Sequence, residues 1–391
     1  MGPGPVSLIS PASLGVVNRT RVLDALHASG PQSRAELART FGVSRATVGT
    51  ILQPLLDSGV LVEEEAQARP AGGRRPRPVW FSASARALGA VEILPGRINV
   101  ALLSLTGEIR HRATAAFPRR ARTADAFHRA LLDTCADVLD GHPVLGVGVA
   151  AAGLLEPGTG RLVELTAVPA LTDYPLVESL AGRLAAPVHL EHHARVQALG
   201  DRWFGPGRGL DTFASASTGE TVGVGIVHHG AVLSAPGAAS GAHMTVVAGG
   251  EHCDCGKRGC WKTIATTGWL RRRAHQLDLP AAADTTLAGL RAAADGGDRT
   301  AAGLVDEYAA NLAVGLGNVQ QLLAPGVFIL HGEAVAGGPA FRDRLAGHLI
   351  RESPRRGGSY QPIVVLADPS QETALLGCAG LVLSRALDTL R

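Results

Sequence analysis

Aromatic residues and lysine are scarce in this 391-residue chain: aromatics make up 4% of it, and lysine occurs only at positions 257 and 262. Its apolar core must therefore consist mainly of alanine, valine and leucine. The longest apolar run, residues 144–155, is interrupted by glycines and is too short to span a bilayer, which takes about 20 residues. The N-terminal segment lacks the basic region of a signal peptide. These absences argue against a membrane or secreted protein and predict a cytoplasmic one.

Charge is modest and unevenly distributed. Hydrophobic residues make up 46% of the chain and charged residues 18%, as in globular proteins, and the length suggests two or three domains. The net charge of +3 lies entirely in residues 1–83, which contain nine arginines against six acidic residues, whereas the remainder carries 28 of each sign. An excess of positive charge is expected where a protein meets a polyanion, and here it amounts to three charges.

Cysteine is also rare, and three of the five cysteines lie with a histidine in residues 241–260. This stretch offers the donors of a closed tetrahedral zinc site: His243, Cys253, Cys255 and Cys260. Gly256 and Gly259 allow the sharp bends that such a site needs. The alternatives are cysteines that merely pack or a disulfide, but the first pair is too close in sequence to bridge comfortably. Few cysteines also fit a reducing compartment. The stretch predicts a structural Zn²⁺ ion.

The first eighty residues contain the signals of a helix-turn-helix unit. Apolar spacing predicts a helix over 18–28, and Ser33 with Glu36 forms a capping box that starts a second helix over 34–41. Gly42 permits a tight turn, and a third helix follows it. Two short helices joined by a turn that contains glycine are typical of DNA-binding proteins.

The N-terminal turn of that third helix is predicted to enter the major groove. Its candidate DNA-contacting residues are Ser44, which also caps the helix, Arg45, Thr47 and Thr50. Arg45 can pair with guanine through two hydrogen bonds, and the threonines can touch thymine methyls or phosphates. Val48, Ile51 and Leu55 are expected to face the core. Pro54 should kink the helix beyond the turn that reads bases.

Strand-like runs at 59–63 and 79–81 predict a β-wing after the third helix. The segment between them is rich in glycine, proline and arginine, and we expect Arg74, Arg75 and Arg77 to reach along a narrow minor groove. The alternative is a solvated, disordered linker that carries a charge run. Its position between two strands behind a helix-turn-helix favours the wing.

From residue 88 onward, predicted strands and helices alternate, which indicates an α/β fold. The strands are expected as a pair within 90–105, at 144–151, as a glycine-rich strand-turn-strand over 217–227, and at 326–330; the helices are expected over 124–139, 261–274 and 301–323.

These features together resemble the ROK family, named for repressors, open reading frames and sugar kinases. The resemblance runs from about residue 16 to the end and is most specific in the His/Cys cluster, in residues 218–227, and in the winged helix-turn-helix ahead of a kinase-like body. It implies a DNA-binding domain over 1–83 and a two-lobed actin-like, ribonuclease-H-like domain over 84–391. The lobes would be about 84–200 with the last helix, and 201–375.

The resemblance further implies a cytoplasmic repressor of carbohydrate metabolism that binds a double-stranded operator as a homodimer or homotetramer.

The resemblance also shows which catalytic residues of the family's sugar kinases are missing from this chain. Sugar kinases of the family carry Glu-Asn-Asp-Ala, with the Asp as general base, where this chain has Glu191, His192, His193 and Ala194. The Asp-x-Gly-Gly-Thr phosphate loop is replaced by residues 92–97, and the glycine run at the adenine site by residues 331–333. Histidine can serve as a base, but the combined losses predict a protein that is not an enzyme.

The sugar-binding positions are altered as well. Family glutamates fall on Ser240 and Lys262, and a sugar-contacting asparagine falls near Ala167. Sugars are held by dense, directional hydrogen bonds, so we expect an effector other than an ordinary hexose, or none. The zinc loop either couples an effector site to the reading head or only supports folding. Two alternatives stay open for the whole chain: an active sugar kinase with an accessory DNA-binding head, and a scaffold that binds no DNA.

Overall fold

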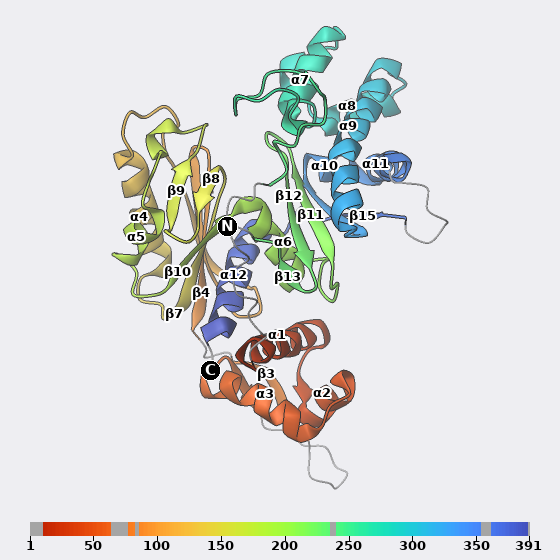
Figure 1. The fold of residues 1–391 in the computed structure, drawn as a ribbon. Helices are drawn as coiled ribbons and strands as arrows, with labels where there is room; N and C mark the ends of the chain where they lie inside the picture. The colour runs from red at the N-terminus through yellow and green to blue at the C-terminus, as the bar shows by residue number, and fades with distance from the viewer. Residues whose placement is uncertain (1–10, 64–76, 83–85, 235–239, 353–360, 390–391) are drawn as a thin grey trace, which may run out of the picture.

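The computed structural model describes residues 11–63, 77–82, 86–234, 240–352 and 361–389. A small head formed by the N-terminal residues lies at one end of a body with two lobes, each built on its own β-sheet (Figure 1). The mixed α/β architecture agrees with the fold class expected from the sequence. Among the described residues, no helix is both long and apolar enough to cross a membrane.

The head contains the predicted helix-turn-helix. Its elements are α1 (Pro11–Ser29), β1 (Gln32–Ser33), α2 (Arg34–Phe41), α3 (Arg45–Asp57), β2 (Leu61–Glu63) and β3 (Pro78–Phe81). The capping box forms as expected: the backbone N–H of Glu36 donates to Ser33 Oγ over 3.3 Å, and that of Ser33 donates to Glu36 Oε2 over 2.8 Å. Gly42 ends α2 with a left-handed φ of 65°.

Two details of the head, the start of the first helix and an additional strand, differ from the sequence-based expectation. The first helix begins at Pro11 rather than Asn18, since proline is well tolerated in the first turn of a helix. Strand β1 was not expected; it pairs with β3, so the wing sheet has the order β1-β3-β2. The third helix continues through Pro54 to Asp57. Arg74 and Arg75 lie outside the described residues.

The first sheet of the body has the strand order β10-β7-β4-β5-β6. These strands are β4 (Ala87–Leu94), β5 (Arg97–Leu103), β6 (Ile109–Ala116), β7 (Val144–Ala151) and β10 (Val188–His192). Side chains alternate between the two faces: Val91 and Val100 pack with α4 (Asp125–Leu139), whereas Ala90 and Ala101 pack toward α12 (Thr373–Thr389). A hairpin of β8 (Leu154–Glu156) and β9 (Arg161–Glu164) and the short α5 (Leu176–Ala181) complete this lobe.

The second sheet repeats the same plan with the order β13-β12-β11-β14-β15. In each sheet an antiparallel three-stranded meander is extended by two parallel strands. The strands of this second sheet are β11 (Phe213–Thr218), β12 (Gly223–His228), β13 (Ala231–Val232), β14 (Val327–Gly332) and β15 (Ile363–Leu366). Its helices are α7 (Thr267–Gln276), α8 (Leu287–Asp295), α9 (Arg299–Leu323), α10 (Glu333–Ala336) and α11 (Gly338–Glu352).

Helix α6 (His193–Phe204) and α12 lie side by side between the two sheets (Figure 1). Glycines bring backbones into direct contact here. A Cβ atom on Gly148 of β7 would lie 2.1 Å from the carbonyl oxygen of Cys378, and one on Gly200 of α6 would lie 2.2 Å from that of Thr373. One apolar cluster runs from head residues such as Leu23 to Leu381 in α12, so head and body share a core.

We therefore expect Gly148→Ala to lower the free energy of unfolding by about 2–3 kcal/mol, because the added methyl meets backbone that has no alternative position. Chemical denaturation of the full chain measures the change. Gly158→Ala is the matched control, since a Cβ there meets nothing within 4 Å. Equal stability of the two variants would contradict this account of the α12 contact.

Candidate functional site

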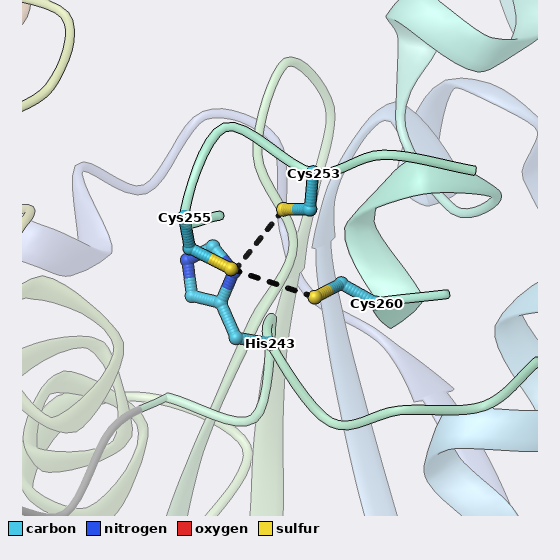
Figure 2. A group of neighbouring side chains, drawn as sticks. All are labelled: His243, Cys253, Cys255 and Cys260. Atoms are coloured by element: carbon cyan, nitrogen blue, oxygen red, sulfur yellow. Dashed lines mark hydrogen bonds between the residues drawn. The ribbon is translucent and has the colours of Figure 1, made fainter. Parts of the chain in front are cut away.

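The four predicted zinc ligands converge on one point (Figure 2). The ligand atoms of His243, Cys253, Cys255 and Cys260 all lie within 4.8 Å of one another. Cys255 Sγ is 3.6 Å from Cys260 Sγ, and Cys253 Sγ is 3.4 Å from His243 Nδ1. In tetrahedral zinc sites with Zn–S bonds of about 2.3 Å, sulfur atoms are about 3.8 Å apart. The donors and their spacing fit a metal ion, and the sulfurs are farther apart than the roughly 2.05 Å of a disulfide.

Glycine and lysine residues shape this metal loop, residues 243–260. Gly256 and Gly259 have left-handed φ values of 83° and 69°, as their predicted role requires. A Cβ on Gly259 would lie 1.7 Å from the carbonyl oxygen of Val247, so only glycine fits there. Lys257 donates to the backbone oxygen of His243 over 3.1 Å, and Lys262 pairs with Asp254 at 2.8 Å. Both lysines of the chain therefore brace this loop.

The segment after the last cysteine differs from the expected helix over 261–274. Residues Trp261–Thr263 form a 3-10 turn, and α7 begins only at Thr267. The break arises because Thr266 acts as the helix cap and accepts a hydrogen bond from the backbone of Trp269 over 3.4 Å. The fully buried Trp261 donates to the backbone oxygen of Asn311 in α9, so the metal loop is anchored on α9.

The predicted reading helix is α3. Ser44 caps it by accepting from the Thr47 backbone over 3.1 Å, and Arg45, Thr47 and Thr50 are all exposed in its first two turns. The opposite face packs into the head through Val48, Leu52 and Leu55, all fully buried. Ile51 is only partly buried. Arg77 is exposed directly before β3, and Arg34 of α2 pairs with Glu63 of β2 at 2.6 Å. This ion pair joins α2 to the second wing strand.

A group of polar side chains surrounds the N-terminal end of α6. Glu92 Oε1 lies 2.9 Å from His193 Nε2, and its other oxygen accepts from Asn99 over 2.6 Å. Burial favours a raised pKa for Glu92, but the hydrogen bonds from His193 and Asn99, together with the positive charges of His193 and Arg97, outweigh it and hold the pKa below its usual value. Glu191 pairs with Arg195 at 2.8 Å and accepts from Ser234 over 2.7 Å. Both carboxylates are therefore engaged within the protein.

His192 has a structural role in the same group. Its Nδ1 accepts from the backbone of Ala194 over 3.2 Å and so caps α6. Burial, assisted by the charge of Arg195, lowers the pKa of His192 to about 4, and the side chain is neutral near pH 7.

The second lobe also uses its polar residues internally. His331 lies 2.8 Å from Asp201, which is fully buried in α6. Thr218 donates to the carbonyl oxygen of His331 over 2.6 Å, and Glu333 accepts from the backbone of Leu287. The backbone oxygen of Ser240 accepts from Val224 over 2.7 Å.

Comparison with known proteins identifies the family of this chain. Residues 88–385 match the ROK family. The chain belongs to the ROK family. It is 23% identical over 389 residues to the xylose repressor of Bacillus subtilis, covering 96% of this chain and 97% of the relative. The glucokinase of Thermotoga maritima is 28% identical over 306 residues, covering 73% of this chain and 94% of the enzyme.

Other similar ROK proteins also include both regulators and sugar kinases. The Escherichia coli regulator NagC is 25% identical over 333 residues, which is 81% of this chain and 80% of NagC. A ROK transcriptional regulator described as a homologue of the E. coli MLC protein superposes with a TM-score of 0.77 at 20% identity, over 96% of this chain and 97% of its own. A Streptomyces griseus ROK glucokinase superposes at 0.63 and 26% identity, over 75% of this chain and 98% of its own. The matches to the xylose repressor and to the MLC homologue each cover 96% of the chain and so include the head.

Several hydrogen-bond partners of the polar residues around α6 were not predicted from the sequence. Sequence reasoning identified His192 and His193, but not Arg195, Ser234 or Asp201, which bind the polar groups of the site. The i, i+4 spacing of Glu191 and Arg195 was a signal that could have found one pair. The other two contacts join residues far apart in the chain, and nothing local indicates them.

Replacement of Cys260 tests the metal centre. We expect Cys260→Ala to reduce bound metal from one ion per chain to none or a small fraction, because three donors with an open fourth position hold a structural ion poorly. Elemental analysis of purified protein measures this. Cys135→Ala is the control, since Cys135 is a buried cysteine outside the cluster. Unchanged metal content in the Cys260 variant would show that the ion is held elsewhere.

Proposed function

We propose that this chain is a sequence-specific, DNA-binding transcriptional regulator of the repressor type, with head 1–83 and ROK body 84–391. The main support is α3, which exposes Arg45, Thr47 and Thr50 in its first two turns within a winged helix-turn-helix head. The relatives that match 96% of the chain, head included, are xylose repressors. Their name and that of the N-acetylglucosamine repressor favour a role in carbohydrate metabolism.

In this proposal α3 reads bases and the wing follows the minor groove. Arg45 pairs with a guanine edge, Thr47 and Thr50 contact thymine methyls or phosphates, and Ser44 lies beside them at the start of the helix. Arg74, Arg75 and Arg77 supply charge along the backbone. Two copies related by a two-fold axis would bind an inverted repeat, as helix-turn-helix dimers do. A homodimer or homotetramer supplies that symmetry.

The ion in the metal loop is Zn²⁺ in this proposal, since three thiolates and an imidazole are the donors that zinc prefers. It would be held by His243, Cys253, Cys255 and Cys260. Its role is structural: it fixes the loop from which Trp261 reaches α9. The loop lies beside α7, at the end of the body far from the head (Figure 1). This position favours a role in folding over a direct contact with the head.

We further propose that the body does not phosphorylate sugars. His193 stands where kinases of the family have their aspartate base, and it faces Glu92. Ser240 and Lys262 replace two family glutamates, and Lys262 pairs with Asp254. A second candidate function rests on this same contact, because a histidine oriented by a carboxylate is a competent general base. The likeness to the T. maritima glucokinase gives it further support.

Turnover assays separate these two functions. We expect no ATP consumption above background with any hexose, because the aspartate, the phosphate loop and the adenine-site glycines are all replaced. Calorimetry with hexoses and phosphosugars is expected to show no low-micromolar binding of ordinary hexoses. A real turnover rate would establish the kinase, and tight binding of a common hexose would restore an ordinary sugar effector.

Arg45→Ala tests the reading helix. We expect it to reduce discrimination at one base pair by about 1–3 kcal/mol, since a bidentate arginine–guanine contact is lost. Selection from randomised duplexes at fixed salt measures this, and the protein's own promoter region is the first probe. Arg291→Ala is the control, because Arg291 is an exposed arginine of the body that pairs with Asp295. Unchanged specificity in the Arg45 variant would show that another element reads the bases.

A further inference from the structure

Helix α6 joins two distant parts of the molecule. Its first residue, His193, contacts Glu92 of the first sheet, and at its other end Arg202 pairs with Asp24 of α1 at 2.8 Å. Every residue from Ala194 to Phe204 is buried. The helix has 12 residues and so spans about 18 Å at 1.5 Å per residue. It thus lies between the polar group described above and the head.

The surroundings of α6 leave it little freedom to bend. A Cβ on Gly377 of α12 would lie 1.9 Å from the carbonyl oxygen of Val196, and one on Gly225 of β12 would lie 2.1 Å from that of Ala194. The helix is therefore in backbone contact on two sides. Close-packed elements respond to a local change by shifting as units between discrete arrangements. A displacement at His193 is thus delivered to the far end of the helix.

At the head end of α6, Arg202 makes the partly buried contact with Asp24 and lies over the ring of Trp203. The ring of His27 lies 5.8 Å from that of Trp203 and 5.4 Å from that of Phe204. Burial lowers the pKa of His27 to about 4, so its ring is neutral near pH 7. Burial also raises the pKa of Asp24 to about 6 against the opposing charge of Arg202, and the carboxyl remains largely ionised at that pH. The Arg202–Asp24 pair is therefore charged.

We propose that α6 transmits changes at the Glu92–His193 contact to the head, with the Arg202–Asp24 pair as the contact that passes them to α1. A small polar molecule that hydrogen-bonds to Glu92 or His193 would compete with that contact and shift the helix. Only the expected effect on DNA binding rests on the proposed function. The coupling between the Glu92–His193 contact and α1 can be measured on the protein without DNA.

Hydrogen exchange of the full chain without DNA tests the link. We expect His193→Ala to change amide exchange across residues 19–27 of α1 by about 3- to 30-fold, the range reached by residues that couple distant sites. In an Asp24→Asn background the same substitution should have no further effect, because the connection is already broken. Asp24→Asn keeps the shape of the side chain, and Arg202→Gln breaks the same pair from the body side.

The control is His348→Ala, which removes another histidine–carboxylate contact, 3.0 Å from Asp306, in the second lobe. It should leave α1 unchanged. The proposal is overturned if His193→Ala does not alter α1 exchange, if its effect persists undiminished when the Arg202–Asp24 pair is broken, or if His348→Ala has the same effect.

Affinity for a promoter fragment supplies the second arm. The effects of His193→Ala and Asp24→Asn on the dissociation constant should be non-additive, as for residues on one route. Additive effects would overturn transmission through this pair. If the unaltered chain binds no duplex, the proposed DNA-binding function fails, and hydrogen exchange still decides whether α6 links the two regions.

Discussion

The close backbone contact of α6 and α12 with each other and with the two sheets is the constraint on which the rest of the structure depends. It exists only because positions 148, 200, 225 and 377 carry no side chain. The two five-stranded sheets are thereby held around a common pair of helices, and α1 of the head packs on that pair. Small residues at such a contact allow little adjustment, since interiors are packed as tightly as organic crystals. Head and body therefore behave as one packed unit.

Local signals in the sequence were sufficient to predict the elements that form locally. The capping residues Ser33 and Ser44 define where α2 and α3 begin, and the cysteine and histidine spacing brings the metal donors together because the loop is short. The contacts that depend on distant partners were not predictable. Strand β1 forms only because β3 passes beside it, and Arg202 meets Asp24 only after the body has folded. The break before α7 was readable in principle from Thr266.

The polar residues near α6 satisfy one another within the protein. A buried carboxylate is costly unless hydrogen bonds and opposite charge compensate it. Glu92 and Glu191 each have both kinds of compensation, from His193 and Asn99 and from Arg195 and Ser234. An incoming polyol would have to displace these hydrogen bonds and ion pairs. Only the difference in free energy between the new contacts and the lost ones would therefore favour binding. This competition lowers the free energy that a plain hexose would gain at these positions.

The placement of the two lysines has a practical consequence for chemical biology. Lys257 and Lys262 both brace the metal loop, through His243 and Asp254. Apart from the terminal amine, every site for an amine-directed reagent or an acyl-transfer modification therefore lies on one small region of this protein. Acylation there would remove a positive charge beside the cysteine cluster. An isotope-labelled dimethylation or fluorophore tag on these amines would thus act as a built-in reporter of that loop alone.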